Sequence, residues 1–598
     1  MKVFAALFAP FFLATTSLLA GIAEQDALFA KLPPSVLVLA ENALEQMSGS
    51  IGKDSAHGRS EWVDVDAAPG FTKALRVTTA QLQPNPWSLQ TTVKTAHEVK
   101  KGDAMLAVFY ARATQPGVGG TAQSAFIFEL GKEPYEKSGN MPFEVSAMWA
   151  KFYVPMESKE DYAAGAALVH FHAGYDPQAV EIGGLQLLNY GKQIGQRGLP
   201  YTPLTYQGRE ADAPWRKEAA ERIEHNRKGD LTVVVRDASG KAVPGAKVAV
   251  RMQKHAYGFG SAVAGDMLFK EGPDAEMYRE VIARSFNKVV LENDLKWDGF
   301  TRNPKLAKDS VQWLRDAGMA VRGHCLLWPG WKNLPKDLAT LPAETLRTRI
   351  LDHVREEVNT FKGQLAEWDV VNEPFTNTDV QKVLGDGILA DVFKLTHELD
   401  PKPLLFINDY GILSHGGTGQ AHQDHYFNTI RSLLDAGAPV QGIGMQGHFN
   451  AQLTPPPRLW KVLDRFATLG LAIQVTEMDI DVWEDDAQAD YTRDLMTAVF
   501  AHPATIGILT WGFWEPRHWI PNAASWRKDW LLRPAGKAWY DMVFHEWWTS
   551  ADLETDASGT AKVRGFLGDY TIEIKTADKT VKQPATLIKA GTRVELAL

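Results

Sequence analysis

Eight short apolar runs alternate with helix-like segments through the middle of this chain, and no other feature limits its possible folds as strongly. The runs lie at residues 257–262, 286–291, 321–327, 366–371, 404–407, 442–445, 471–475 and 506–510. Apolar strands separated by helices are typical of a parallel sheet, and eight repeats over about 290 residues match a (β/α)8 TIM barrel. The alternative is a doubly wound open sheet, but its glycine-rich phosphate-binding motif is missing. The sequence therefore predicts an α/β chain with a (β/α)8 barrel at its centre.

The sequence on either side of the barrel is rich in β-like runs. Between residues 24 and 200 these runs are short, at 74–79, 104–113, 124–130, 143–153, 167–172 and 180–190, and helical periodicity is scarce. This pattern predicts an N-terminal antiparallel β-sandwich. We expect a linker and a charged helix at 201–230, with the helix at 214–227, and a β-hairpin at 231–254 around the turn 237–240. The barrel domain is assigned to 255–548, and a C-terminal β element to 549–598. The hairpin and this element both flank the barrel and are candidates to pack together.

Residues 1–23 have the pattern of a secretory signal peptide. Lys2 precedes an apolar stretch at 3–19, and Gly21 and Ala23 supply small residues near a cleavage site. An uncleaved membrane anchor is the alternative, but the stretch is short for one. We therefore expect a secreted or periplasmic protein with no membrane association after signal cleavage. Because Cys325 is the only cysteine, no intramolecular disulfide can form.

The charge balance disfavours a polyanionic partner. The formal net charge is −9, whereas nucleic-acid-binding proteins usually present a basic surface. We expect no nucleic-acid partner, a neutral ligand and a monomeric protein.

Polar residues gather where the apolar runs end. The stretches are Glu292-Asn293-Asp294-Leu295-Lys296-Trp297, Gly323-His324-Cys325-Leu326-Leu327-Trp328, Trp368-Asp369-Val370-Val371-Asn372-Glu373-Pro374, Asn408-Asp409-Tyr410, Gln446-Gly447-His448, Thr476-Glu477-Met478-Asp479 and Trp511-Gly512. A buried strand normally avoids such residues because an unpaired polar group costs free energy. They are tolerated where barrel strands open into a cleft, which lies at the C-terminal face. The sequence thus predicts a polar, aromatic-lined site there.

Two glutamates in this set are candidates for a catalytic pair. Glu373 ends the fourth run and Glu477 the seventh, and these strands face each other across a closed barrel. A retaining glycosidase needs two carboxyl groups about 5–5.5 Å apart. Either glutamate alone could belong to a structural ion pair. A metal site at His448, Glu477 and Asp479 is a further alternative, but hydrogen bonding accounts for all three, so we expect no metal and no cofactor.

These motifs resemble those of glycoside hydrolase family 10, the β-1,4-xylanases. The stretches at 368–374 and 476–480 resemble the two active-site signatures of the family, and the other strand-end motifs follow in the family's order over about residues 255–545. The resemblance implies an endo-1,4-β-xylanase that cleaves internal bonds of xylan with retention of configuration. Glu373 would be the acid/base and Glu477 the nucleophile.

The resemblance also implies roles for the surrounding residues. The residues implied to bind substrate are Glu292, Asn293, Lys296, His324, Trp328, Asn372, Gln446, His448 and Trp511. Asp479 would support the nucleophile through His448. We expect a raised pKa for Glu373, and an ionised Glu477 that accepts hydrogen bonds from His448 and Gln446.

Some features depart from the family or have alternative interpretations. Pro329 and Trp331 stand where the family often has histidine and glutamine, which puts substrate preference in question. A β-1,4-glucanase on the same barrel and a non-catalytic polysaccharide-binding protein are the alternative functions. The N-terminal sandwich resembles a carbohydrate-binding module. The residues expected to be packed are Cys325, Trp62, Trp87, Trp149 and Tyr153, and those expected at the surface are His422 and His425.

Overall fold

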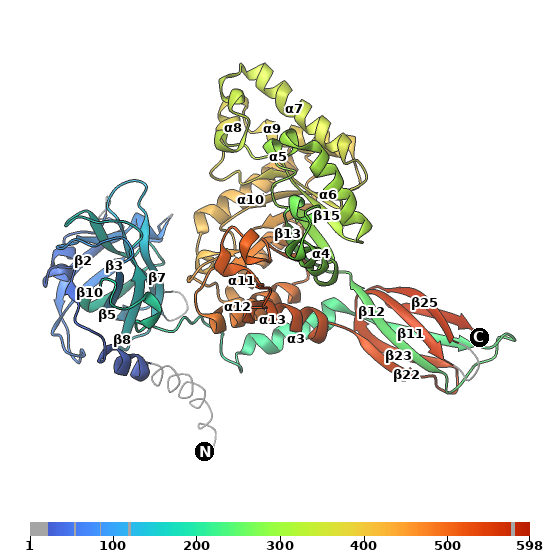
Figure 1. Cartoon of the computed structure of the whole chain (residues 1–598), viewed down its shortest axis with the longest axis horizontal. Coiled ribbons are helices and arrows are strands. Elements are labelled where there is room, and N and C mark those ends of the chain that lie inside the picture. The colour runs from blue at the N-terminus through green and yellow to red at the C-terminus, as the bar shows by residue number, and fades with distance from the viewer. Residues whose placement is uncertain (1–21, 53–55, 84, 118–120, 576–579) are drawn as a thin grey trace. The chain divides into compact units, whose positions relative to one another are not determined.

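The computed structural model describes residues 22–52, 56–83, 85–117, 121–575 and 580–598 (Figure 1). The chain forms two compact units, one extending to Thr205 together with Thr418–Ala421, the other comprising Tyr206–Gly417 and His422–Leu598. Most of the predicted signal peptide lies outside the described residues. Within the described ranges, no helix combines the length and apolar composition needed to cross a membrane.

The first unit is an antiparallel β-sandwich, as predicted. Its larger sheet has the order β2-β3-β10-β5-β8, with β1 beside β10, and its smaller sheet has the order β4-β9-β6-β7. The strands are β1 (Val36–Leu37), β2 (Gly58–Asp64), β3 (Lys73–Thr79), β4 (Gln90–Lys94), β5 (Ala104–Gln115), β6 (Ala122–Leu130), β7 (Lys137–Val145), β8 (Ala150–Glu157), β9 (Ala167–His172) and β10 (Gln178–Asn189), and a short helix, α2 (Ala43–Met47), precedes β2.

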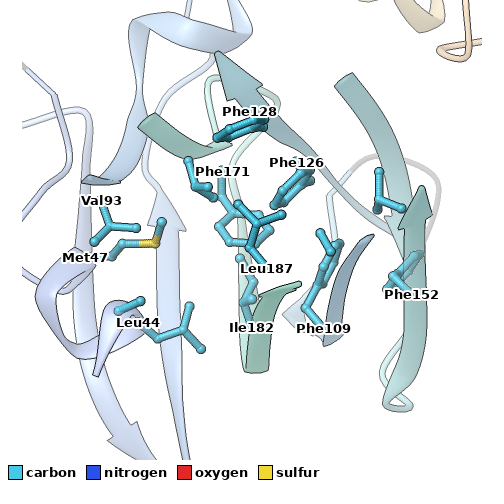
Figure 2. Close-up of a cluster of buried hydrophobic side chains, with 14 of the residues drawn as sticks. Leu44, Met47, Val93, Phe109, Phe126, Phe128, Phe152, Phe171, Ile182 and Leu187 are labelled. Carbon is cyan, nitrogen blue, oxygen red and sulfur yellow. The ribbon is translucent and has the colours of Figure 1, made fainter. Parts of the chain in front are cut away.

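Aromatic side chains fill the space between the two sheets (Figure 2). The ring of Phe109 on β5 lies 5.1 Å from Phe152 on β8, between ring centres, and 5.3 Å from Phe171 on β9. Such offset and edge contacts add to the free energy gained by burying large apolar rings. Residues alternate between this core and the outer face because successive strand side chains point to opposite sides.

Two expectations for this unit are wrong. The single run predicted at 143–153 contains the end of β7 and the start of β8, since residues 146–149 turn the chain without the glycine or proline that usually marks a turn. Trp87 is 58% exposed rather than packed. Tyr153 is fully buried, whereas Trp62 and Trp149 are half-buried.

The centre of the second unit is a closed barrel of eight parallel strands, as predicted. The sheet order β18-β17-β16-β15-β14-β13-β21-β20 closes through pairing of β18 with β20. The strands are β13 (Gly258–Val263), β14 (Lys288–Leu291), β15 (Ala320–Leu327), β16 (Glu367–Asn372), β17 (Leu404–Asp409), β18 (Gly442–Met445), β20 (Ala472–Ile480) and β21 (Thr505–Thr510), and the two-residue β19 (His448–Phe449) also pairs with β20. Each strand of the barrel is almost entirely buried.

Helices follow the strands and cover the barrel. They are α4 (Pro273–Ser285), α5 (Trp297–Arg302), α6 (Pro304–Asp316), α7 (Ala343–Thr360), α8 (Asp379–Leu384), α9 (Gly387–Leu399), α10 (Gln420–Asp435), α11 (Pro456–Ala467), α12 (Asp485–Ala501) and α13 (Pro534–Asp541). In α6 the Asn303 side chain accepts a hydrogen bond from the Leu306 amide, and proline occupies the first position, where its missing N–H costs nothing. Ala307, Val311 and Leu314 bury one face of this helix at helical spacing.

The segments flanking the barrel form two further sheets. Helix α3 (Pro214–Arg227) leads into β11 (Lys228–Arg236), which lies between β23 (Thr560–Phe566) and β26 (Thr592–Ala597). In contrast, β12 (Lys247–His255) lies between β22 (Ser550–Glu554) and β24 (Gly568–Lys575), with β25 (Thr580–Leu587) at the edge. The turn predicted at 237–240 forms, and Arg236 pairs with Ala242 across it. The predicted pairing of the two long strands is wrong, because β11 and β12 belong to different sheets. Each strand pairs instead with the C-terminal β element, which supplies more apolar partners than a two-stranded hairpin can.

Candidate active site

A cleft of about 650 Å³ lies over the C-terminal ends of the barrel strands. The candidate residues that line it are Glu292, Lys296, His324, Trp328, Asn372, Glu373, Gln446, His448, Glu477, Asp479 and Trp511. Asn293 is the one candidate outside this lining, and its side-chain oxygen accepts a hydrogen bond of 2.9 Å from the Lys296 ammonium. Closure of the barrel thus brings Glu292 and Trp511 into one cleft, although they are almost 220 positions apart in the sequence.

Glu373 follows β16 and has a backbone φ of +51°, a left-handed conformation that residues other than glycine rarely adopt. Its carboxyl group accepts hydrogen bonds from the Gln446 amide at 3.1 Å, the Trp328 indole at 3.2 Å and the Asn377 amide at 3.3 Å. Burial raises the pKa of Glu373, and the negative charge of Glu477 raises it further. This environment favours a protonated carboxyl group.

Glu477 has the opposite electrostatic environment. Its carboxylate accepts hydrogen bonds from the Asn408 amide at 2.8 Å and from His448 Nε2 at 3.2 Å. Burial alone would raise the pKa of Glu477, but the hydrogen bonds from His448 and Asn408 bring it below its usual value. The expected hydrogen bond from Gln446 to Glu477 is wrong, because the Gln446 amide bonds to Glu373, and Asn408 is the amide donor to Glu477.

His448 lies between Glu477 and Asp479. Its Nδ1 is 2.8 Å from Asp479 Oδ2, which also accepts a hydrogen bond of 2.8 Å from the Trp519 indole. Although burial opposes the charged form, these two carboxylates raise the pKa of His448 to about 10. A protonated imidazole donates through both nitrogens, so His448 fixes the orientation of Glu477.

Lys296, Trp328 and Trp511 form one side of the cleft. The Lys296 ammonium lies 5.5 Å from the ring centre of Trp328 and 5.9 Å from that of Trp511, within the range of cation–π attraction. Glu292 belongs to the same cleft, and burial raises its pKa. A ring face beside polar groups suits a ligand with both apolar and hydroxyl surfaces.

The side-chain amide of Asn372 uses its oxygen but not its nitrogen in hydrogen bonding. Its oxygen accepts a hydrogen bond of 2.9 Å from the Asn408 amide, whereas its Nδ2 is buried and has no hydrogen-bond partner among the residues that the structure describes. Buried polar groups are rarely left without a partner, so this Nδ2 is available to a ligand hydroxyl.

A network of buried charges lies in the barrel interior and reaches His324. His324 Nδ1 is 2.9 Å from Asp369 Oδ2, and Arg322 bonds to both Asp369 and Glu367. Lys288 bonds to Glu367 and, at 2.8 Å, to Gln474 on the non-adjacent strand β20. The network therefore crosses the barrel interior and fixes the His324 ring at the floor of the cleft.

Comparisons with known proteins decide the family. A model of glycosyl hydrolase family 10 matches residues 249–540. Endo-1,4-beta-xylanase B of Paenibacillus barcinonensis is 31% identical over 310 residues, which cover 46% of this chain and 90% of that protein. The chain belongs to glycosyl hydrolase family 10.

Other relatives share a smaller part of their length with this family 10 chain. Anti-sigma-I factor RsgI6 of Acetivibrio thermocellus is 32% identical over 61% of the chain and 47% of its own length. Endo-1,4-beta-xylanase 1 of Arabidopsis thaliana is 29% identical over 59% of the chain and 37% of its own length. The chain thus spans less than half of either relative. The crystal structure of xylanase 10B from Thermotoga petrophila with xylobiose has 29% identity, a TM-score of 0.43, and coverage of 47% of this chain and 92% of that one.

The positions that depart from the common family 10 motif lie outside the cleft lining. Pro329 is buried and Trp331 is half-buried, and the Trp331 amide donates a hydrogen bond of 3.0 Å to Asp379. Their neighbour Lys332 does line the cleft. Cys325 is buried, as expected, and burial raises the pKa of its thiol.

Sequence reasoning assigned no role to three residues that contact the candidate groups. Asn408 bonds to Glu477, Asn377 bonds to Glu373, and Trp519 bonds to Asp479. Asn408 stood in a strand-end motif and could have been assigned from its position. Asn377 and Trp519 lie on loops, whose course the pattern of apolar residues does not predict. Within the described part of the chain, no group of three or more His, Cys, Asp or Glu side chains is arranged to hold a metal ion.

Proposed function

We propose that this protein is an endo-1,4-β-xylanase that hydrolyses internal bonds of xylan with retention of configuration. The observation that carries the proposal is the contrast between Glu373 and Glu477, which line one cleft with pKa values shifted in opposite directions. Retaining glycosidases need one protonated and one ionised carboxyl group on the two sides of the bond to be cleaved. The xylanase names of several family 10 relatives support xylan as the substrate.

The reaction would proceed in two displacements. The Glu477 carboxylate attacks the anomeric carbon while Glu373 protonates the departing glycosidic oxygen, which leaves a glycosyl ester on Glu477. The ester no longer carries the charge that raised the pKa of Glu373, so Glu373 then takes a proton from water. That water attacks the anomeric carbon and releases Glu477. The Asn372 Nδ2 group would bond to the 2-hydroxyl of the sugar at the cleavage point.

The remaining cleft residues would hold the polysaccharide. We assign sugar binding to Glu292, Asn293, Lys296, His324, Trp328, Gln446, His448 and Trp511, and support of the nucleophile to Asp479. No metal or cofactor takes part in this scheme.

The test is Glu477→Ala, assayed by reducing-end release from xylan, mixed-linkage glucan and carboxymethylcellulose. We expect loss of roughly a thousandfold or more on xylan, as for removal of a covalent nucleophile, and an unchanged rate for the exposed control Glu344→Ala on α7. Unchanged xylan activity in Glu477→Ala would contradict the assignment. Release by the wild type from the glucans alone would instead establish the glucanase alternative.

We extend the proposal to the other parts of the chain. The sandwich at 24–200 would bind polysaccharide, the parts at 201–254 and 549–598 would flank the catalytic domain at 255–548, and residues 1–23 would direct export of a monomer. The exposed Trp87 is the best candidate for sugar contact, since flat rings stack on sugar C–H surfaces. In a Glu477→Ala background, Trp87→Ala should weaken retention on insoluble xylan, whereas Met148→Ala, at another exposed apolar residue, should not. Equal retention of the two variants on insoluble xylan would show that Trp87 does not contact the polysaccharide.

A further inference from the structure

His422 on α10 is buried, although its position after the fifth strand predicts a surface residue. Only 9% of it is exposed. Its ring stacks on Phe375 with 3.8 Å between ring centres and an angle of 17°, and Tyr410 packs edge-on against it at 4.8 Å. Phe375 lies two residues after Glu373, so the imidazole supports the loop that follows the proposed acid/base.

The same imidazole contacts a carboxylate at the end of β17. His422 Nε2 lies 3.3 Å from Asp409 Oδ1, which also accepts the Tyr410 amide at 2.9 Å. Asp409 is fully buried, and among the described residues neither its Oδ2 nor His422 Nε2 completes a hydrogen bond, so the 3.3 Å approach is a close polar contact. A buried carboxylate with so few polar neighbours depends on each of them.

Asp409 is adjacent to the backbone that holds Glu373. The Glu373 amide donates a hydrogen bond of 2.8 Å to the carbonyl of Asn408, the residue before Asp409. The Tyr410 hydroxyl, on the other side of Asp409, donates to Thr376 at 3.3 Å. The end of β17 and the loop 373–377 are therefore joined directly by this amide and this hydroxyl. They are also joined through His422 on α10, which stacks on Phe375 and contacts Asp409.

We propose that His422 is a positioning residue for Glu373, whose ring supports the loop carrying Phe375 and whose Nε2 holds the Asp409 carboxylate in place. The inference rests on the proposed function of Glu373 as acid/base. It assigns two separable contributions to one side chain, an apolar stack on Phe375 and a polar contact with Asp409.

The polar contact has an electrostatic consequence with a definite sign. Burial raises the pKa of Asp409, and the adjacent His422 imidazole lowers it. An ionised Asp409 in turn helps raise the pKa of Glu373. Loss of the His422 donor would therefore favour a neutral Asp409 and lower the pKa of Glu373. The alkaline limb of the activity profile, where the general acid loses its proton, would then move to lower pH.

Other ionisable groups surround the pair and must be considered in the pH profile. Those facing Asp409 and His422 are Tyr410 at the end of β17, His415 on η6 (His415–Gly417), His425 and Tyr426 on α10, and Glu373 after β16. Burial lowers the pKa of both His415 and His425, so both are neutral along the alkaline limb and hold no charge there to lose.

Two substitutions at one position separate the contributions. His422→Phe keeps a ring for the stack and removes the donor, so the alkaline limb should move down by roughly half a pH unit or more, the scale of one buried charge near another. His422→Gln keeps a donor and removes the stack, so kcat should fall about two- to tenfold, the scale of a misplaced general acid, with the alkaline limb unmoved. KM should change little in either variant. A folded His422→Phe with the wild-type alkaline limb would overturn the inference.

Asp409→Asn gives the same readout if His422→Phe does not fold. It should move the alkaline limb in the same direction, and the double variant should add no further shift, because both changes act on one charge. An unmoved limb in Asp409→Asn would also overturn the inference. The matched control is His502→Phe, since His502 is also buried and lies 3.0 Å from Asp464 but is not part of the cleft. This control should lose thermal stability and keep the wild-type profile.

The profiles distinguish a failure of this inference from a failure of the proposed function. A wild type that cleaves no β-1,4-glycan, or whose alkaline limb survives Glu373→Ala, would contradict the role of Glu373 itself. If the alkaline limb of the pH–activity profile disappears in Glu373→Ala but keeps its wild-type position in His422→Phe, only the role of His422 is contradicted.

Discussion

Asn408 Nδ2 lies 2.8 Å from Glu477 Oε1, and the same nitrogen lies 2.9 Å from Asn372 Oδ1. Both amide hydrogens of Asn408 are thus committed, and its oxygen accepts a hydrogen bond of 2.7 Å from the Thr476 hydroxyl. Asn408 is fully buried. One side chain of β17 therefore sets the orientation of two groups on neighbouring parts of the cleft.

Asn408→Ala should raise the pKa of Glu477, because it removes a donor to the charged form. We expect the acidic limb of kcat/KM to move up by roughly one pH unit and the free energy of unfolding to fall by about 1–3 kcal/mol, since Asn372 and Thr476 lose their partner. The pH profile and urea unfolding measure these effects. Gln441→Ala is the control, because Gln441 bonds to the Leu405 amide near the opposite end of β17. An acidic limb that stays in place would show that His448 alone keeps Glu477 ionised.

Glu373→Ala should affect substrates according to their leaving groups. General acid catalysis contributes about 10²–10⁴-fold when the leaving group is a sugar alkoxide, whereas an activated phenolate leaves without protonation. We expect the rate on xylo-oligosaccharides to fall within that range and the first displacement on a dinitrophenyl glycoside to change little. Single-turnover phenolate release measures this displacement. Equal losses on both substrates would contradict an acid/base role.

His448→Gln should lose stability in a pH-dependent manner. The pKa of His448 is raised from 6.5 to about 10 by Asp479 and Glu477, against the effect of burial. A raised pKa means that the folded chain keeps a proton that the unfolded chain releases, so the stabilisation is complete below pH 6.5 and is lost as the pH approaches about 10. The difference in unfolding free energy between wild type and His448→Gln should therefore shrink across this window. A difference that is constant from pH 6.5 to 10 would indicate a neutral His448.

Gly323→Ala should destabilise the barrel. A Cβ atom at this position on β15 would lie 2.2 Å from the Trp368 ring, and Trp368 is itself buried. Overpacking of this kind costs about 1–3 kcal/mol, which thermal unfolding would detect. Gly387→Ala is the control, because Gly387 begins α9 with no atom within 4 Å of the added Cβ. Equal melting temperatures for the two variants would contradict the close packing of β15 on Trp368.

The barrel was predictable because its strands are short apolar runs with polar ends. The predicted runs at 442–445 and 167–172 and the helix at 214–227 coincide with β18, β9 and α3. Polar side chains at the ends of buried strands also predicted most of the cleft lining. These features depend on local patterns, which a sequence displays directly.

The errors concern features that depend on tertiary partners. The predicted pairing of β11 with β12 was wrong because each strand pairs with residues more than 290 positions away. No local pattern of residues indicates such pairing. His422 was misplaced because helical spacing does not show that Phe375 and Asp409 close over one face of α10. The partner of Gln446 was wrong for a related reason: Gln446 and Asn408 are both amides at strand ends, and only the barrel geometry shows that Gln446 bonds to Glu373 and Asn408 to Glu477.

The charges beneath the cleft constrain how this barrel can change over generations. Lys288, Arg322, Glu367 and Asp369 pair with one another in the buried interior of the barrel. An apolar replacement of any one of them would leave an opposite charge buried and unpaired, at a cost of about 3–5 kcal/mol. Replacement of the whole set by well-packed apolar residues carries no such cost. Loss of the four charges by single substitutions would therefore pass through variants with a lower free energy of unfolding. We expect these four positions to be conserved together or replaced together.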